Sequence, residues 1–78
     1  MNEKVLKLIN DERQRQDENW GADRLLDNVT WLTILVEEVG ETAETILKSS
    51  NTKKELVQVA AVAVAWLECL ERLESPEA

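Results

Sequence analysis

A cluster of acidic side chains lies in the middle of the chain, in the stretch EEVGE that contains Glu37, Glu38 and Glu41. On a helix, which turns by about 100° per residue, these carboxylates share one arc beside an apolar stripe. Residues 29–47 hold four acidic residues and no lysine or arginine. Because unpaired like charges beside a core are costly, a bound cation is one explanation, and a solvated acidic face is the other.

A second polar pair, Glu55 and Gln58, is three residues apart on the next predicted helix, so both side chains point the same way. In an antiparallel hairpin with a short turn they should lie level with Glu41 and Glu38. Two helices would then present up to four carboxylates and one amide to one space, and oxygen-only ligands suit Mg²⁺ or Mn²⁺. Two other roles stay open: Glu55 closing a capping box that begins at Thr52, and Gln58 as a satisfied core amide.

Three helices are expected to position these side chains. The patterns predict them over residues 2–17, 28–48 and 52–74 of one domain, residues 1–78, with a frayed tail at 75–78. Asp27 or Asn28 is expected to cap the second helix. The turn SSNT is short, so the second and third helices should form an antiparallel hairpin.

Apolar residues of the second helix form a stripe that is expected to face the core: Leu32, Leu35, Val39, Ala43 and Ile46. The poor helix former Gly40 is interpreted as the position where the facing helix comes close.

The third helix is apolar on nearly all sides, since Gln58 is the only polar residue in the stretch LVQVAAVAVAWL. Such a helix is buried on more than one side, and three helices in a 78-residue chain can hardly surround it. We therefore predict an all-α, three-helix protomer with an antiparallel helix hairpin. Homo-oligomerisation through the third helix, as a dimer or a tetramer, would complete a four-helix-type bundle.

The composition narrows the chemistry further. A net charge of −7 repels nucleic acid polymers and anionic membranes, and no apolar run is long enough to span a bilayer. No signal peptide is visible, and one cysteine without a disulfide partner suits a reducing cytoplasm. Without histidine, catalysis would have to rest on carboxylates, lysines or a metal-bound water.

EEVGE followed by Glu55 resembles the MazG-like, all-α nucleoside triphosphate pyrophosphohydrolases, whose motif is E-E-x-x-E, a gap, and then E-x-x-D. The segments DERQRQDENWG and ELVQVAAVAVAWLE are also similar to those of small phage or bacterial members. One position departs from the motif, because Gln58 stands where the family has a metal-binding aspartate. The gap between the two parts of the motif is also near the short end.

The resemblance implies Mg²⁺-dependent hydrolysis of a (deoxy)nucleoside triphosphate to the monophosphate and pyrophosphate, with Mn²⁺ as another suitable ion. It assigns the metal to Glu38, Glu41 and Glu55, with Gln58 as a weaker fourth ligand. Glu37 would be catalytic, binding a second ion or helping to deprotonate the attacking water. The alternative is a non-catalytic helical module that retains the fold for oligomerisation or nucleotide binding.

Three further side chains are candidates for contact with substrate. Lys53 and Lys54 stand at the start of the third helix, where the helix dipole favours phosphates, although solvated lysines are the simpler interpretation. Trp20 could stack on a base or cap the core. Two other tryptophans and the cysteine are interpreted as packing residues: Trp31, Trp66 and Cys69.

Overall fold

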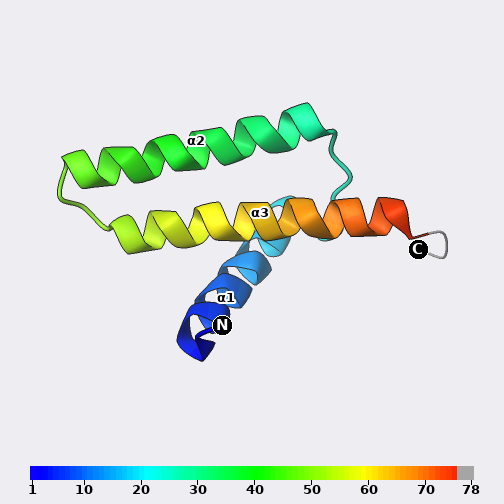
Figure 1. Ribbon diagram of the computed structural model, residues 1–78, viewed down its shortest axis with the longest axis horizontal. Helices are drawn as coiled ribbons and strands as arrows, with labels where there is room; N and C mark the ends of the chain where they lie inside the picture. Colours follow the sequence, from blue (N-terminus) through cyan, green and yellow to red (C-terminus); the bar gives the residue numbers. More distant parts are fainter. Residues whose placement is uncertain (76–78) are drawn as a thin grey trace.

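Three α-helices make up the fold, and the computed structural model of the protein describes residues 1–75. Helix α1 spans Glu3–Trp20, α2 spans Asn28–Leu47 and α3 spans Thr52–Glu74. No β-strand occurs in this part of the chain, so the predicted all-α class is confirmed. α2 and α3 lie side by side and antiparallel, whereas α1 crosses α3 obliquely (Figure 1).

Two helix ends are set by backbone hydrogen bonds. α1 continues to Trp20 instead of ending near Asp17, and it stops at Gly21, whose positive φ of 95° suits glycine. The Gly21 N–H donates to the carbonyl of Asp17 at 2.8 Å. At the end of α3 the Ser75 N–H donates to the carbonyl of Glu71 at 3.1 Å. The rest of the predicted frayed tail, residues 76–78, lies outside the described residues.

The two helices of the hairpin begin at capping side chains. Asp27 caps α2, where its carboxylate accepts from the Thr30 N–H at 2.8 Å. Asn51 caps α3 by accepting from the Lys54 N–H at 3.1 Å. The predicted cap at Thr52, with its capping box to Glu55, is therefore wrong by one residue. The side-chain oxygen of Asn51 accepts the backbone N–H in the first turn instead. The carboxylate of Glu55 is thus not used as a cap.

The described core is small and centres on α3. Trp31 of α2 is 1% exposed and packs with Val62, Ala65 and Cys69 of α3, and the cysteine is fully buried. The predicted packing roles of Trp31 and Cys69 are confirmed. Trp66 is half-buried against this core, and its indole N–H donates to the side-chain oxygen of Asn28 at 3.0 Å.

Of the predicted apolar stripe of α2, Leu35 is half-buried and packs against the core, whereas the other residues are exposed. Leu32 is 51% exposed, Val39 is 50% exposed and Ile46 is 64% exposed. The expectation fails because α1 lies against α3 and, within the described residues, not against α2. The close neighbour expected at Gly40 is also not found, since a Cβ added there would meet nothing within 4 Å.

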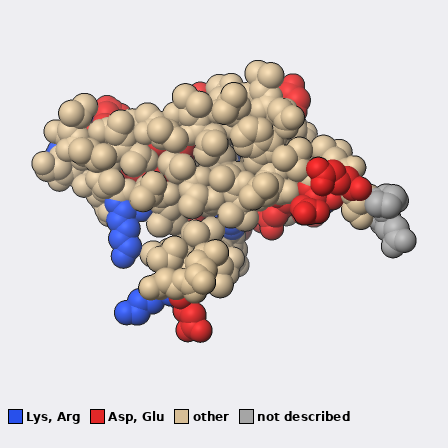
Figure 2. Space-filling model, viewed as in Figure 1, with Lys and Arg blue, Asp and Glu red and all other residues tan. Residues whose placement is uncertain are grey.

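We call the uncovered apolar surface of the hairpin the outer face. Its residues are Val29, Leu32, Val36, Val39, Ala43 and Ile46 of α2, and Leu56 and Leu67 of α3. The side of the hairpin seen in Figure 2 is mostly uncharged, with a basic side chain projecting near the start of α3 and acidic side chains near its end. None of the described helices has the length and apolarity needed to cross a membrane.

Candidate metal centre

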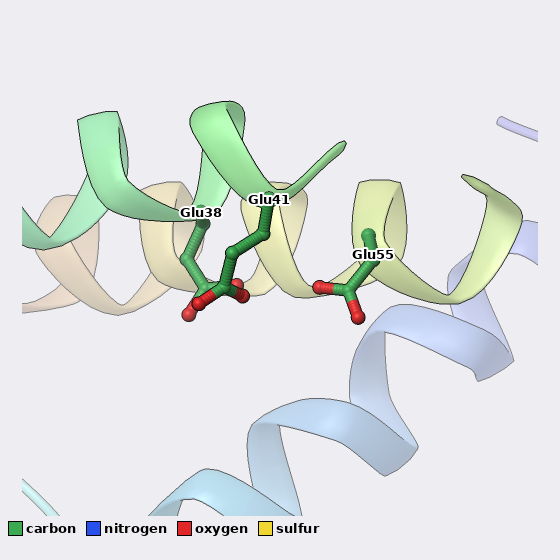
Figure 3. A group of neighbouring side chains, drawn as sticks. All are labelled: Glu38, Glu41 and Glu55. Carbon is green, nitrogen blue, oxygen red and sulfur yellow. The ribbon is translucent and has the colours of Figure 1, made fainter. Parts of the chain in front are cut away.

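Three carboxylates converge on the side of the hairpin opposite the outer face. Glu38 and Glu41 stand one turn apart on α2, and Glu55 belongs to the first turn of α3. One oxygen of each lies within 4.8 Å of the corresponding oxygens of the other two. The side chains point to the same space, toward the side on which α1 lies (Figure 3). The short turn between the helices brings about this convergence, as the spacing of the acidic residues predicts.

Gln58 also faces this group, so the hairpin register inferred from the sequence holds. In the amide orientation that satisfies both of its ends, Gln58 donates to Glu38 Oε2 at 3.0 Å and to Glu55 Oε2 at 2.9 Å. Its nitrogen thereby bridges carboxylates from two helices. To serve as the predicted fourth ligand, the amide would have to turn its oxygen toward the cation.

Burial and the neighbouring carboxylates raise the pKa of Glu38. Partial burial, the charges of Glu41 and Glu55, and a hydrogen bond shared with Glu41 raise the pKa of Glu38 from 4.5 to about 7. The charge of Glu12, on α1, contributes to the same rise in pKa. Without a cation, a substantial fraction of Glu38 is therefore protonated near neutral pH, and a cation would have to displace that proton.

Two residues of α1 near the carboxylates were not assigned a role from the sequence, namely Glu12 and Arg15. The Arg15 guanidinium donates to both oxygens of Glu12, at 2.8 and 2.6 Å. The amide of Gln16, which is 2% exposed, also donates to Glu12 at 3.2 Å. The only signal in the sequence is an opposite-charge pair three residues apart, which is ordinary on exposed helices.

The three carboxylates fit a divalent cation. Mg²⁺ lies about 2.1 Å from its oxygen ligands, so opposite ligands are about 4.2 Å apart. Among three octahedral ligands at most one pair is opposite, and adjacent ligands are about 3.0 Å apart. The three oxygens, all within 4.8 Å of one another, would therefore have to move closer together around an ion, which the long glutamate side chains allow. Oxygen-only ligands suit Mg²⁺, Mn²⁺ and Ca²⁺, so the group could hold a metal ion without specifying which.

Two hollows lie near the carboxylates, and one of them includes Glu38 in its wall. The first, which we call the α1–α3 groove, has a volume of about 370 Å³ and includes both predicted lysines in its wall. Its polar wall residues are Asp11, Glu12, Arg15, Asn51, Lys53 and Lys54. The second, which we call the Trp20 cavity, has a volume of about 300 Å³. Its wall residues are Trp20, Arg24, Ile34, Glu37, Glu38 and Val62.

The remaining predicted residues lie at the Trp20 cavity. Glu37 is exposed and lines this cavity, and it is not one of the three carboxylates that converge. Trp20 is 55% exposed, so it does not cap the core. The guanidinium groups of Arg15 and Arg24 each lie 5.7 Å from the centre of its ring. Glu37 and Trp20 are thus adjacent to the group of three carboxylates rather than part of it.

No family model matches the chain, and neither a curated protein nor a solved structure matches it.

Proposed function

We propose that the protein is a Mg²⁺-dependent nucleoside triphosphate pyrophosphohydrolase of the MazG-like type. One observation carries this proposal: Glu38, Glu41 and Glu55 converge from two helices with one oxygen each within 4.8 Å of the others. The hollows on either side add basic and aromatic side chains, the groups that contact phosphates and bases. The resemblance of EEVGE and Glu55 to the family motif supports the same reaction.

In the proposed reaction, a water oxygen attacks the α-phosphorus and the bond from this phosphorus to the bridging α–β oxygen breaks. The products are a nucleoside monophosphate and pyrophosphate, and the proton released by the water passes to a carboxylate, for which Glu37 is the candidate. Glu38, Glu41 and Glu55 would hold Mg²⁺. When bound, the ion would neutralise the polyphosphate and lower the pKa of the attacking water.

Substrate contacts are proposed for three further side chains. Lys53 and Lys54 line the α1–α3 groove, beside Glu55, and would contact phosphate oxygens. Trp20 lines the cavity that contains Glu38 and would contact the nucleoside. We also propose a cytoplasmic location, because Cys69 is the only cysteine and it is free.

A second part of the proposal is a homo-oligomer, a dimer or tetramer in which hairpins pair as a four-helix bundle. On the outer face, α2 places apolar residues alternately three and four residues apart from Val29 to Ile46, the spacing of a helix that packs along another helix. The positions flanking this row are uncharged: Thr33, Leu35, Gly40, Thr42 and Leu47. Two copies, each with a net charge of −7, can therefore meet here without placing charged side chains opposite one another. The predicted contact through α3 is thus extended to α2.

Pyrophosphate release from a panel of ribo- and deoxynucleoside triphosphates tests the proposed activity. We expect release from at least one nucleotide with Mg²⁺, and loss of release when the ion is chelated. No release from any nucleotide with either Mg²⁺ or Mn²⁺ would contradict the proposal.

The second candidate function is a non-catalytic oligomerisation or nucleotide-binding module. It is favoured by one contact, since Gln58 donates to Glu38 and Glu55 and offers no fourth charge. Gln58→Asp distinguishes the candidates. For the enzyme, we expect tighter Mg²⁺ binding and faster hydrolysis, because a carboxylate then joins the three others. For the module, nucleotide would bind without turnover in the parent, and the substitution would not start turnover.

A further inference from the structure

Two lysines at the start of α3 are unpaired in a strongly acidic chain. Five of the nine basic residues form ion pairs in the described structure: Lys7, Arg13, Arg15, Lys48 and Arg72. Lys53 and Lys54 have no carboxylate oxygen within 4.0 Å in the part of the chain that is described. Among the basic residues without an ion pair in the described structure, Lys53 and Lys54 are the two that line the α1–α3 groove, where an anion could pair with them.

A third basic side chain reaches the same hollow from another helix. Arg15 of α1 lines the α1–α3 groove together with Lys53 and Lys54, and its side chain is 47% exposed. Its present partner, Glu12, is 11% exposed and accepts from both Arg15 and Gln16. Because Gln16 would still bond to Glu12, the arginine can turn to a different anion without leaving that carboxylate unbonded.

The groove is coupled electrostatically to the carboxylate group. The charge of Lys54 lowers the pKa of Glu12, although the contact with Arg15 is the main cause of that lowering. The charge of Glu38 contributes to the raised pKa of Arg15, again after the contact with Glu12. Arg15 of the groove therefore lies close enough to Glu38 of the candidate metal centre for their charges to interact.

The two hollows adjoin at Arg15, which lines the α1–α3 groove and whose guanidinium lies 5.7 Å from the ring centre of Trp20 in the other cavity. In Figure 3 the carboxyl groups of Glu38 and Glu41 overlap in the view, and that of Glu55 lies to one side of them. The Trp20 cavity contains Glu38, whereas the α1–α3 groove contains Lys54, the neighbour of Glu55. An elongated ligand that extends from the Trp20 cavity into the groove would thus have one end beside Trp20 and the other beside Lys53 and Lys54, and it would pass Arg15.

We propose that the α1–α3 groove binds the terminal phosphates of the substrate, the part that leaves as pyrophosphate, with Arg15 exchanging Glu12 for phosphate oxygens. A guanidinium group can bond to two phosphate oxygens at once, and Lys53 and Lys54 add charge from the facing helix. The nucleoside then lies in the Trp20 cavity. The identity of the substrate rests on the proposed function, but binding of pyrophosphate by the groove can be measured without any hydrolysis.

Calorimetric titration with inorganic pyrophosphate in the presence of Mg²⁺ tests this assignment. We expect the parent to bind, and Arg15→Gln to weaken binding about tenfold or more, as loss of a charge-assisted contact does. The double variant Lys53→Gln/Lys54→Gln should show a similar loss, and Arg15→Lys a smaller one. The matched control is Arg24→Gln at the Trp20 cavity, for which we expect a change below about twofold.

Three results would overturn the assignment: no pyrophosphate binding by the parent, unchanged binding by Arg15→Gln and the double lysine variant, or an equal loss in Arg24→Gln. If the protein hydrolyses a nucleotide but Arg15→Gln binds pyrophosphate as tightly as the parent, the assignment of the groove is wrong and the proposed activity stands. If pyrophosphate binding depends on Arg15 but no nucleotide is hydrolysed, the assignment of the groove is supported and the proposed activity is contradicted. Because Arg15, Lys53 and Lys54 are partly or fully exposed, the variants are expected to melt within a few degrees of the parent.

Discussion

The two sides of the α2–α3 hairpin differ in the partner that each lacks within the described residues, which is a cation on the inner side and apolar cover on the outer face. The inner side gathers Glu38, Glu41 and Glu55 without a basic side chain in contact with them among the described residues. The outer face carries apolar side chains, such as Leu32 and Ile46, that no other part of residues 1–75 covers. One side would be stabilised by a cation and the other by apolar cover. The same two helices can therefore serve both a site and an interface, because helical spacing sends the two kinds of residue in different directions.

The largest effect is expected from removing one carboxylate of the inner side. Glu41→Gln should lower Mg²⁺-dependent pyrophosphate release about 1000-fold, which corresponds to about 4 kcal/mol of lost charge stabilisation. Glu44→Gln is the matched control on the same helix, since Glu44 is exposed and paired with Lys48 at 3.0 Å. Initial rates of pyrophosphate release measure both. Equal rates for the two variants would show that Glu41 does not act at the metal site.

A charge placed in the outer face should disrupt assembly. Val39→Asp is expected to raise the dissociation constant of the oligomer about 100-fold, because an unpaired carboxylate would be buried in an apolar contact. Analytical ultracentrifugation measures the change. The control is Gln14→Asp, which adds the same charge at an exposed position of α1. If both variants assemble like the parent, the outer face is not the interface.

The inner side also predicts how stability depends on pH when metal is absent. The pKa of Glu38 is raised from 4.5 to about 7 in the folded protein, so its proton stabilises the fold below the lower value. This stabilisation is lost as the pH rises through the upper value. The shift corresponds to about 3 kcal/mol before solvent screening and about 1 kcal/mol after it.

Urea unfolding in chelator at about pH 5 and about pH 8 measures this loss. The parent should be less stable at the higher pH, and Glu38→Gln should remove most of the difference. A parent that gains stability over this range, or a variant with the same dependence as the parent, would contradict the proton on Glu38.

The smallest effect is expected at Gly40, near the edge of the outer face. An added Cβ would meet nothing within 4 Å, so Gly40→Ala should stabilise the fold by about 0.5–1 kcal/mol through helix propensity alone. Thermal unfolding measures the gain. Reduced self-association in this variant would instead place a helix of a second copy against Gly40, extending the outer face.

The inner side could be predicted from the sequence largely because local rules determine it. The spacing of Glu38 and Glu41 places them on one helical face, and a four-residue turn fixes the level of Glu55 and Gln58 across the hairpin. The cap was misplaced by one residue, because Asn51 and Thr52 are both good capping residues and only the local backbone decides between them.

The contributions of α1 and the outer face could not be predicted in the same way. Periodicity shows which side of a helix is apolar but not which element covers it. The stripe through Leu32 and Val39 was therefore assigned to the core, and Glu12 and Arg15 were assigned no role. Both depend on where α1 packs, which its own sequence does not determine.

The central claim is that carboxylates from two helices form one divalent cation site, and Mn²⁺ binding followed by electron paramagnetic resonance tests it most directly. We predict one ion bound per chain, competition by Mg²⁺, and loss of binding in Glu38→Gln, Glu41→Gln and Glu55→Gln but not in Glu44→Gln. Absence of saturable Mn²⁺ binding, or equal binding by all four variants, would contradict the claim.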